Sequence, residues 1–272
     1  MKGYKVLVLS ALTCLVLLSA CSERALAARE GRIFFAVSEY YPDGKEGVAP
    51  SILLSMNTEK IYPCCNYSIE AFFQRVVSSL RVEIRGIRQP EICLTAIGPA
   101  SWGDFLELDD GVYSLEFSDG PLNSSYELEV TEDALMVSRP PGHAPADFAS
   151  PEFLVWWRCP RNSFVVLCGT MEETAWIYED FIQRLRAAVE LEEIEFPAYG
   201  ELGYPRAPEG HYVDHPARYF VYDEEADFAA AGEALRAYVR DVIGQPLGVS
   251  IWLRNWKNES YRSWMMDGAL DK

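Results

Sequence analysis

The chain has 272 residues, of which 24 are basic and 41 acidic, so its net charge is −17, and 49% of its residues are hydrophobic. This composition excludes a disordered or collagen-like chain and provides a sizeable core for one large or two ordinary domains. The excess of acids also excludes a general binder of nucleic acid, because affinity for the phosphate backbone requires a basic surface.

The first 20 residues have the features of an export signal. Lys2 and Lys5 give a positive start, and residues 6–18 then form an almost uninterrupted apolar stretch. Thirteen helical residues reach about 20 Å, which is too short for a hydrocarbon core of about 30 Å but is typical of a secretory signal. We therefore expect residues 1–20 to be a signal peptide.

The end of this stretch, Leu18-Ser19-Ala20-Cys21, resembles the lipobox of bacterial lipoproteins. The resemblance implies cleavage before Cys21, which then carries diacylglycerol and an N-acyl chain that anchor the protein in the cell envelope. Position 22 is Ser rather than Asp, and in a host with two membranes this implies sorting to the outer membrane. An ordinary signal cut near Ala27 and an uncleaved anchor are the alternatives.

A mature chain that begins at Cys21 has 22 basic and 41 acidic residues, a net charge of −19. Anionic headgroups do not attract such a surface, so the expected contact with the membrane is through the acyl chains alone. Residues 21–31 are expected to form a tether that reaches at most roughly 35–40 Å. The mature sequence contains no second apolar segment of the length that a membrane span needs.

Residues 32–138 have the pattern of an all-β domain. Short runs of β-branched and aromatic residues alternate with turn sequences such as Asp109-Asp110-Gly111. Residues 80–84 and 126–130 alternate apolar and polar positions, as strands with one solvated face do. The pattern predicts an Ig-like β-sandwich. The expected strands are residues 33–37, 51–56, 80–84, 92–97, 112–117 and 126–130, whereas residues 69–79 fit either a strand or a helical turn.

Residues 139–151 contain four prolines, which disfavour both a helix and a central strand. This segment is therefore expected to be a semi-rigid linker between two domains. Residues 152–272 then alternate strand and helix patterns in the order β-α-β-β-α-β, which predicts a ferredoxin-like α+β domain. Residues 153–157 are expected to add an edge strand to it.

Five cysteines remain in the mature chain besides the one in the lipobox, and export permits disulfides. The expected pairs are Cys159 with Cys168, and Cys93 with either Cys64 or Cys65. Because five is an odd number, at least one thiol stays free or pairs outside the chain. The CxxC spacing of structural zinc sites is absent, so we expect no metal on these thiols.

No catalytic residue is assigned, because the mature chain lacks Gly-x-Ser-x-Gly, GxGxxG and phosphate-loop motifs, and no cofactor is expected. His211, Asp214 and His215 are candidate metal ligands, since histidines four residues apart share one face of a helix. Pro216 follows directly, however, and favours a solvent-exposed loop. A metal-dependent hydrolase that uses these three residues is the alternative function.

Four tryptophans are candidate contacts for a partner. Trp156 and Trp157 are adjacent, so on a strand they point to opposite faces, and Trp256 and Trp264 lie near the C-terminus. Exposed aromatic rings stack on sugars or anchor a partner protein, whereas buried ones fill a core or a domain interface. The leading hypothesis is a non-enzymatic, lipid-anchored envelope protein that binds a protein or glycan, and a structural spacer is a further possibility.

Overall fold

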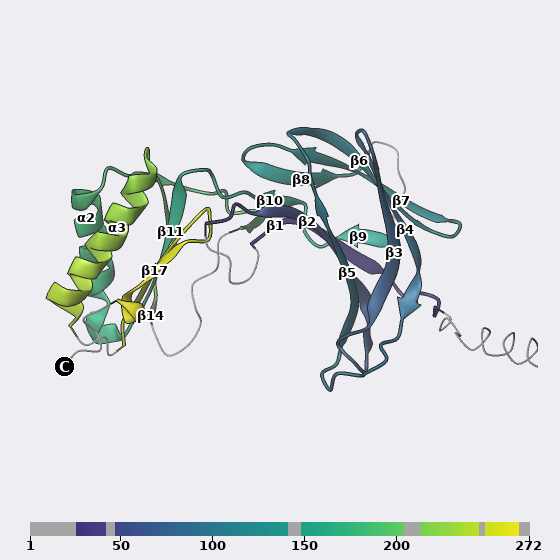
Figure 1. The fold of residues 1–272 in the computed structure, drawn as a ribbon, viewed down its shortest axis with the longest axis horizontal. Helices are drawn as coiled ribbons and strands as arrows, with labels where there is room; N and C mark the ends of the chain where they lie inside the picture. The colour runs from purple at the N-terminus through teal and green to yellow at the C-terminus, as the bar shows by residue number, and fades with distance from the viewer. Residues whose placement is uncertain (1–25, 42–46, 141–147, 204–212, 245–247, 267–272) are drawn as a thin grey trace, which may run out of the picture.

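The structure, a computed structural model, describes residues 26–41, 47–140, 148–203, 213–244 and 248–266. Its strands form two sheets that lie side by side along the long axis of the molecule (Figure 1). The signal peptide, Cys21 and His211 lie outside the described residues, so the expectations for them remain predictions.

The first sheet has eleven strands and mixes antiparallel with parallel pairs. It curls, so the apolar side chains that alternate along its strands meet in one core. The rings of Phe35 and Phe117 lie 4.5 Å apart in this core, and those of Phe35 and Tyr126 lie 5.0 Å apart. The strands are β1 (Ile33–Tyr40), β2 (Ser51–Tyr62), β3 (Ser68–Val76), β4 (Ser79–Arg88), β5 (Gly98–Leu106), β6 (Gly111–Asp119), β7 (Leu122–Val130), β8 (Ala134–Ser138), β9 (Ala149–Pro151), β10 (Val155–Trp157) and β13 (Glu201–Leu202), in the spatial order β13-β10-β8-β7-β6-β4-β3-β5-β2-β1-β9.

The second sheet has six strands, and two helices cover one of its faces, the face turned away from the first sheet (Figure 1). The helices are α2 (Trp176–Ala188) and α3 (Glu225–Tyr238), and a π-helical turn, Val239–Ile243, extends α3. Short 3₁₀ turns lie at Glu172–Thr174 and Ser263–Met265. The strands are β11 (Ser163–Thr170), β12 (Glu192–Ile194), β14 (Val213–Asp214), β15 (Arg218–Val221), β16 (Ser250–Asn255) and β17 (Ser260–Arg262), with β14 paired to β11 beside the order β12-β15-β11-β16-β17.

The predicted fold class, a discrete Ig-like sandwich followed by a ferredoxin-like domain, is wrong. Residues 32–138 form most of one curled sheet rather than two sheets packed face to face. That sheet also takes β9, β10 and β13 from the second half of the chain, where β9 pairs with β1 and β10 pairs with β8. Without these pairs, β1 and β8 would be edge strands with unpaired backbone groups. The short strands β9 and β10 satisfy those groups, which a two-sheet sandwich would satisfy through other strand pairs.

Most individual elements lie where the periodicity of the sequence predicts them, with one clear exception. Residues 92–97, expected to be a strand, form an irregular loop in which Ile92, Leu94 and Ile97 are exposed. Residues 69–79, for which strand and helical turn were both open, lie mainly in β3. The strand expected near residues 153–157 exists as β10, but it belongs to the first sheet.

The segment that precedes β1 is held against the first sheet. The backbones of Ala27 and Ile87 exchange two hydrogen bonds, of 3.0 and 2.8 Å. Gly86 gives this segment room, because its φ is +146° and a Cβ there would lie 2.8 Å from the carbonyl oxygen of Ala27. Arg29 adds an ion pair of 2.7 Å with Asp119. The N-terminal segment therefore packs on the first sheet from Ala27 onward.

Candidate functional site

Two clefts lie where residues of the two sheets meet. The aromatic cleft, of about 620 Å³, runs along β12 and β15 and is lined by Tyr178, Glu179, residues 193–198, Gly200, Leu202 and residues 216–219. The carboxylate cleft, of about 690 Å³, is lined by Glu39, Ala49, Pro50, residues 108–110, Glu132, residues 158–159, Arg161 and Trp256. Cavities of this size are typical of ligand sites.

One arginine organises the charged side of the aromatic cleft. Arg218 binds Glu193 with two hydrogen bonds of 2.6 Å, and its third nitrogen lies 3.3 Å from Glu179. The hydrogen bonds from Arg218 lower the pKa of Glu193, so this carboxyl is ionised at neutral pH. Glu195 lines the same cleft. Arg186 also forms an ion pair with Glu193, so three carboxylates and two guanidinium groups meet on this side of the cleft and leave a small excess of negative charge.

Aromatic rings form the other side of this cleft. Phe196 and Tyr219 meet edge to face, with ring centroids 4.9 Å apart, and burial raises the pKa of Tyr219. Tyr199, between two lining residues, is 63% exposed, and its carbonyl accepts a hydrogen bond of 2.6 Å from the indole of Trp157. Gly200 permits this close approach, since a Cβ there would lie 2.9 Å from the Trp157 nitrogen. The rim of the cleft is therefore held in place by β10 of the first sheet.

The carboxylate cleft contains a buried ion pair that joins segments far apart in the sequence. The side chain of Glu39 is only 2% exposed and lies 3.0 Å from Nε of Arg158, while its second oxygen accepts the Cys159 backbone N–H at 3.1 Å. Burial raises the pKa of Glu39, and the hydrogen bond from Arg158 opposes this rise. Arg158 also donates to the carbonyl of Thr131 at 2.7 Å, so it is fixed from two sides.

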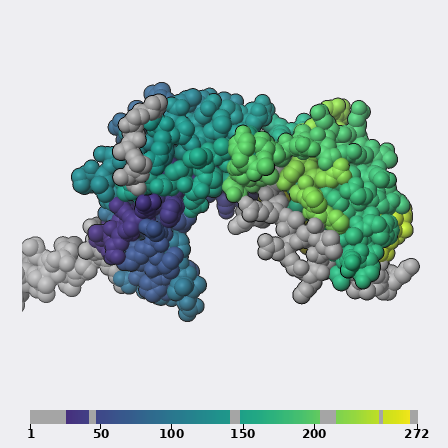
Figure 2. Space-filling view, turned by 180° about the vertical axis from the view of Figure 1, so that it is seen from behind, coloured from purple at the N-terminus to yellow at the C-terminus, as the bar shows by residue number. Residues whose placement is uncertain are grey.

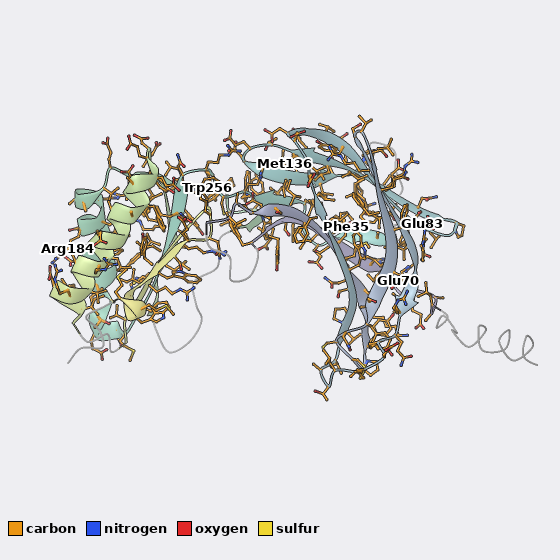
Figure 3. All side chains as sticks on the ribbon, in the orientation of Figure 1. Phe35, Glu70, Glu83, Met136, Arg184 and Trp256 are labelled. Atoms are coloured by element: carbon orange, nitrogen blue, oxygen red, sulfur yellow. A yellow bond between two sulfur atoms is a disulfide. The ribbon has the colours of Figure 1, made fainter. Side chains whose placement is uncertain are left out.

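The four predicted tryptophan contacts have different environments. Trp157 borders the aromatic cleft through Tyr199, and Trp256 lines the carboxylate cleft, on the side of the second sheet that faces the first (Figure 3). Trp156 packs on the core of the first sheet, beside Phe153 at 5.3 Å. Trp264 is 41% exposed and lines neither cleft. Of the four, Trp256 therefore lines a cleft and Trp157 supports a segment beside one.

Several lining residues were not singled out from the sequence. Phe196 and Tyr219 have the sequence pattern of ordinary strand residues. A single sequence does not show that β12 and β15 lie side by side and bring these two rings to a cleft. Glu39 could have been found from the sequence, because it is the only acid in the apolar stretch that forms β1. An acid inside a buried strand normally has a partner, and here that partner is Arg158.

The predicted metal site is only partly within the described residues. His215 is half-buried; its Nε2 lies 2.8 Å from the Thr170 hydroxyl, and its ring stacks on Tyr178 at 4.5 Å. His211 and the side chain of Asp214 lie outside the described residues, so their convergence with His215 remains a prediction. In the part of the chain that the structure describes, no group of three His, Cys, Asp or Glu side chains is placed to hold a metal ion.

The cysteines confirm one predicted disulfide. Cys64 and Cys93 are bonded, with their Cα atoms 5.3 Å apart, whereas the adjacent Cys65 is an exposed free thiol. The predicted bridge between Cys159 and Cys168 is not formed, since Cys168 is a free, buried thiol. Cys168 points to the helix-covered face of β11, whereas Cys159 packs with residues of the opposite face. Burial raises the pKa of the Cys168 thiol to about 12.

No family model, curated protein or solved structure matches this chain. Among the helices that the structure describes, none is long and apolar enough to cross a membrane.

Proposed function

We propose that this protein is a non-enzymatic lipoprotein of the bacterial cell envelope, anchored through Cys21, that binds a basic segment of a partner protein in the aromatic cleft. The lipobox resemblance of residues 18–21 supports the anchor. The observation that carries the binding role is the aromatic cleft itself, in which rings line one side and carboxylates outnumber the arginines that pair with them on the other.

A basic, extended segment suits both sides of this cleft. Tyrosine and phenylalanine rings provide contact area that loses little conformational entropy on binding. Glu195, and Glu179 with its 65% exposed side chain, attract lysine or arginine side chains of the partner. The carboxylates also disfavour acidic partners, as does the net charge of the whole chain.

Binding can be tested with the protein that begins at Ser22 and three probes. These are a decapeptide alternating lysine and leucine, its glutamate–leucine counterpart, and the neutral sugar chitohexaose. We expect the lysine peptide to bind, with an affinity that falls as salt rises, because exposed charges are screened. The Glu179→Gln/Glu195→Gln variant is expected to bind about tenfold more weakly, measured by fluorescence anisotropy with a labelled peptide.

The matched control is Glu172→Gln/Glu173→Gln, which removes the same charge from exposed positions outside the cleft. This control is expected to bind like the unmodified protein. Equal losses in both double variants would show that net charge alone attracts the peptide. Tighter binding of chitohexaose than of the lysine peptide would replace the protein partner by a glycan.

A further inference from the structure

The end of the first sheet carries an exposed aliphatic surface on the loop that joins β4 to β5. Ile92, Leu94 and Ile97 are 78%, 53% and 74% exposed, and Ile61 near the end of the adjoining β2 is 56% exposed. We call residues 89–97 the aliphatic loop. Several exposed aliphatic side chains on one short segment mark an interaction surface more often than chance scatter does.

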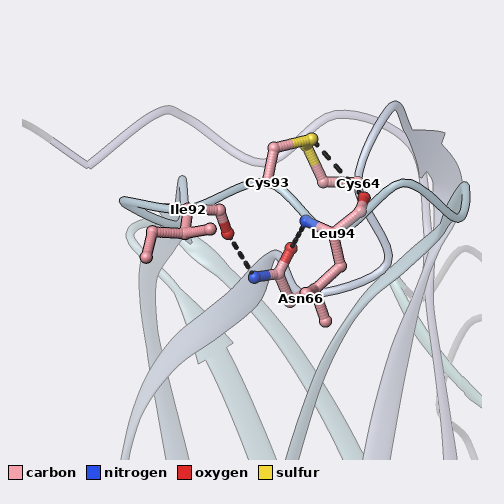
Figure 4. The surroundings of a disulfide bond; sticks show 5 residues. All are labelled: Cys64, Asn66, Ile92, Cys93 and Leu94. Atoms are coloured by element: carbon pink, nitrogen blue, oxygen red, sulfur yellow. Dashed lines mark hydrogen bonds between the residues drawn. A yellow bond between two sulfur atoms is a disulfide. The ribbon is translucent and has the colours of Figure 1, made fainter.

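The aliphatic loop is fixed although it has no regular secondary structure (Figure 4). The disulfide of Cys93 with Cys64 ties it to the segment between β2 and β3. The side chain of Asn66 adds two hydrogen bonds, one donated to the carbonyl of Ile92 at 2.7 Å and one accepted from the N–H of Leu94 at 3.2 Å. Because these contacts fix the backbone of the loop, its aliphatic side chains stay exposed to solvent in the folded protein. Their exposure is therefore a property of the fold and does not come from a loose loop.

The N-terminal segment leaves the fold at this same end of the sheet. Ala27 pairs with Ile87 in antiparallel fashion, so from Ala27 back to Leu26 the chain lies beside the end of β4 that leads into the aliphatic loop. In Figure 2 the first described residues, in purple, pack against the blue lobe that contains this end of the sheet. Only five residues lie between Cys21 and Ala27 in the sequence, and the six residue steps from one to the other span about 20 Å when extended.

We propose that the aliphatic loop inserts into the surface of the lipid bilayer beside the acylated Cys21. This inference rests on the proposed lipid anchor, which would hold the loop end of the first sheet within about 20 Å of the membrane. A short tether also raises the local concentration of lipid around the loop, so even weak insertion is populated. The loop has one charged residue, Glu91, and so its insertion depends on apolar burial rather than on anionic headgroups.

The test uses the full lipoprotein, purified from the membrane fraction and reconstituted into phosphatidylcholine vesicles. An intact mass measurement first establishes whether Cys21 is acylated. In a Cys65→Ser background, Ile97→Cys is labelled with the environment-sensitive dye NBD, and Ile92→Cys provides a second labelling site. The matched control is Val112→Cys, which is similarly exposed (54%) at the start of β6, the opposite end of the sheet.

We expect NBD emission at positions 92 and 97 to rise at least twofold on reconstitution, and to be quenched by spin-labelled lipid, with no change at position 112. Acylated protein with the same response at all three positions would overturn the inserted loop but leave the anchor intact. An unacylated Cys21 would overturn both the anchor and the inference that depends on it.

Discussion

The two sheets bury their apolar side chains in different ways. The first sheet curls around its own core, and none of the described helices packs on it. The second sheet is covered by α2 and α3 on one face, while on its other face Val165 and Leu167 pack toward the junction with the first sheet. The carboxylate cleft therefore lies at the junction, whereas the aromatic cleft lies where the second sheet meets α2, which contributes Tyr178 and Glu179 to its lining.

The largest expected effects on stability come from removing one large buried side chain from each core in turn. Phe35→Ala in the first core and Phe181→Ala in the second remove fully buried rings, and each is expected to cost about 3–5 kcal/mol of unfolding free energy. Because the two cores share no buried residue, calorimetry should resolve two transitions, with each variant lowering a different one. Both variants shifting one common transition would show that the sheets unfold together.

The disulfide also distinguishes the stabilities of the two sheets, because it links segments of the first sheet alone. The Cys64→Ser/Cys93→Ser variant is expected to lower the stability of the first transition by about 3–4 kcal/mol, because the bridge closes a loop with a sequence separation of 29. The second transition should not move. Cys65→Ser is the control, and Cys65 should react with a thiol reagent in the folded protein, whereas Cys168 should react only after unfolding.

The smallest expected effect concerns the ion pair at the junction. Because burial raises the pKa of Glu39, its protonated form is favoured by the folded state, and its contribution to stability falls as pH rises above 4.5. The unmodified protein should therefore lose stability relative to Glu39→Gln as the pH rises from 4 to 7, measured by urea denaturation. Glu127→Gln, at an exposed position of β7, is the matched control.

Local structure was predictable from the sequence where periodicity was strong. The alternation in residues 126–130 predicts β7, and the apolar face that includes Phe181 and Leu185 predicts α2. Long-range pairing was not predictable, because the two or three residues of β9, β10 and β13 carry too little pattern to show which sheet they join. The predicted sandwich failed because β1 to β8 pair into one continuous sheet, and the pattern within each strand does not show how the strands pair.

The candidate site was predictable only in its parts. Trp256 lines the carboxylate cleft and Trp157 binds the carbonyl of Tyr199 beside the aromatic cleft, while the expectation that these tryptophans contact a partner stays a prediction. The pairing of Arg218 with Glu193 depends on β12 lying beside β15, which single-sequence patterns do not reveal. The strand-like pattern of residues 92–97 was misleading because its apolar side chains are exposed on a disulfide-linked loop.

Adjacent cysteines create a choice of partner in a chain whose thiols oxidise before it has folded. Cys64 and Cys65 are neighbours, yet in the folded protein Cys64 is buried and bonded to Cys93 while Cys65 faces solvent. If oxidation precedes folding and joins Cys65 to Cys93, the neighbouring thiol of Cys64 is in reach to attack that bond and exchange it. The Asn66 contacts to Ile92 and Leu94 then favour the bond to Cys64, so the cysteine pair corrects its own pairing errors as the loop assembles.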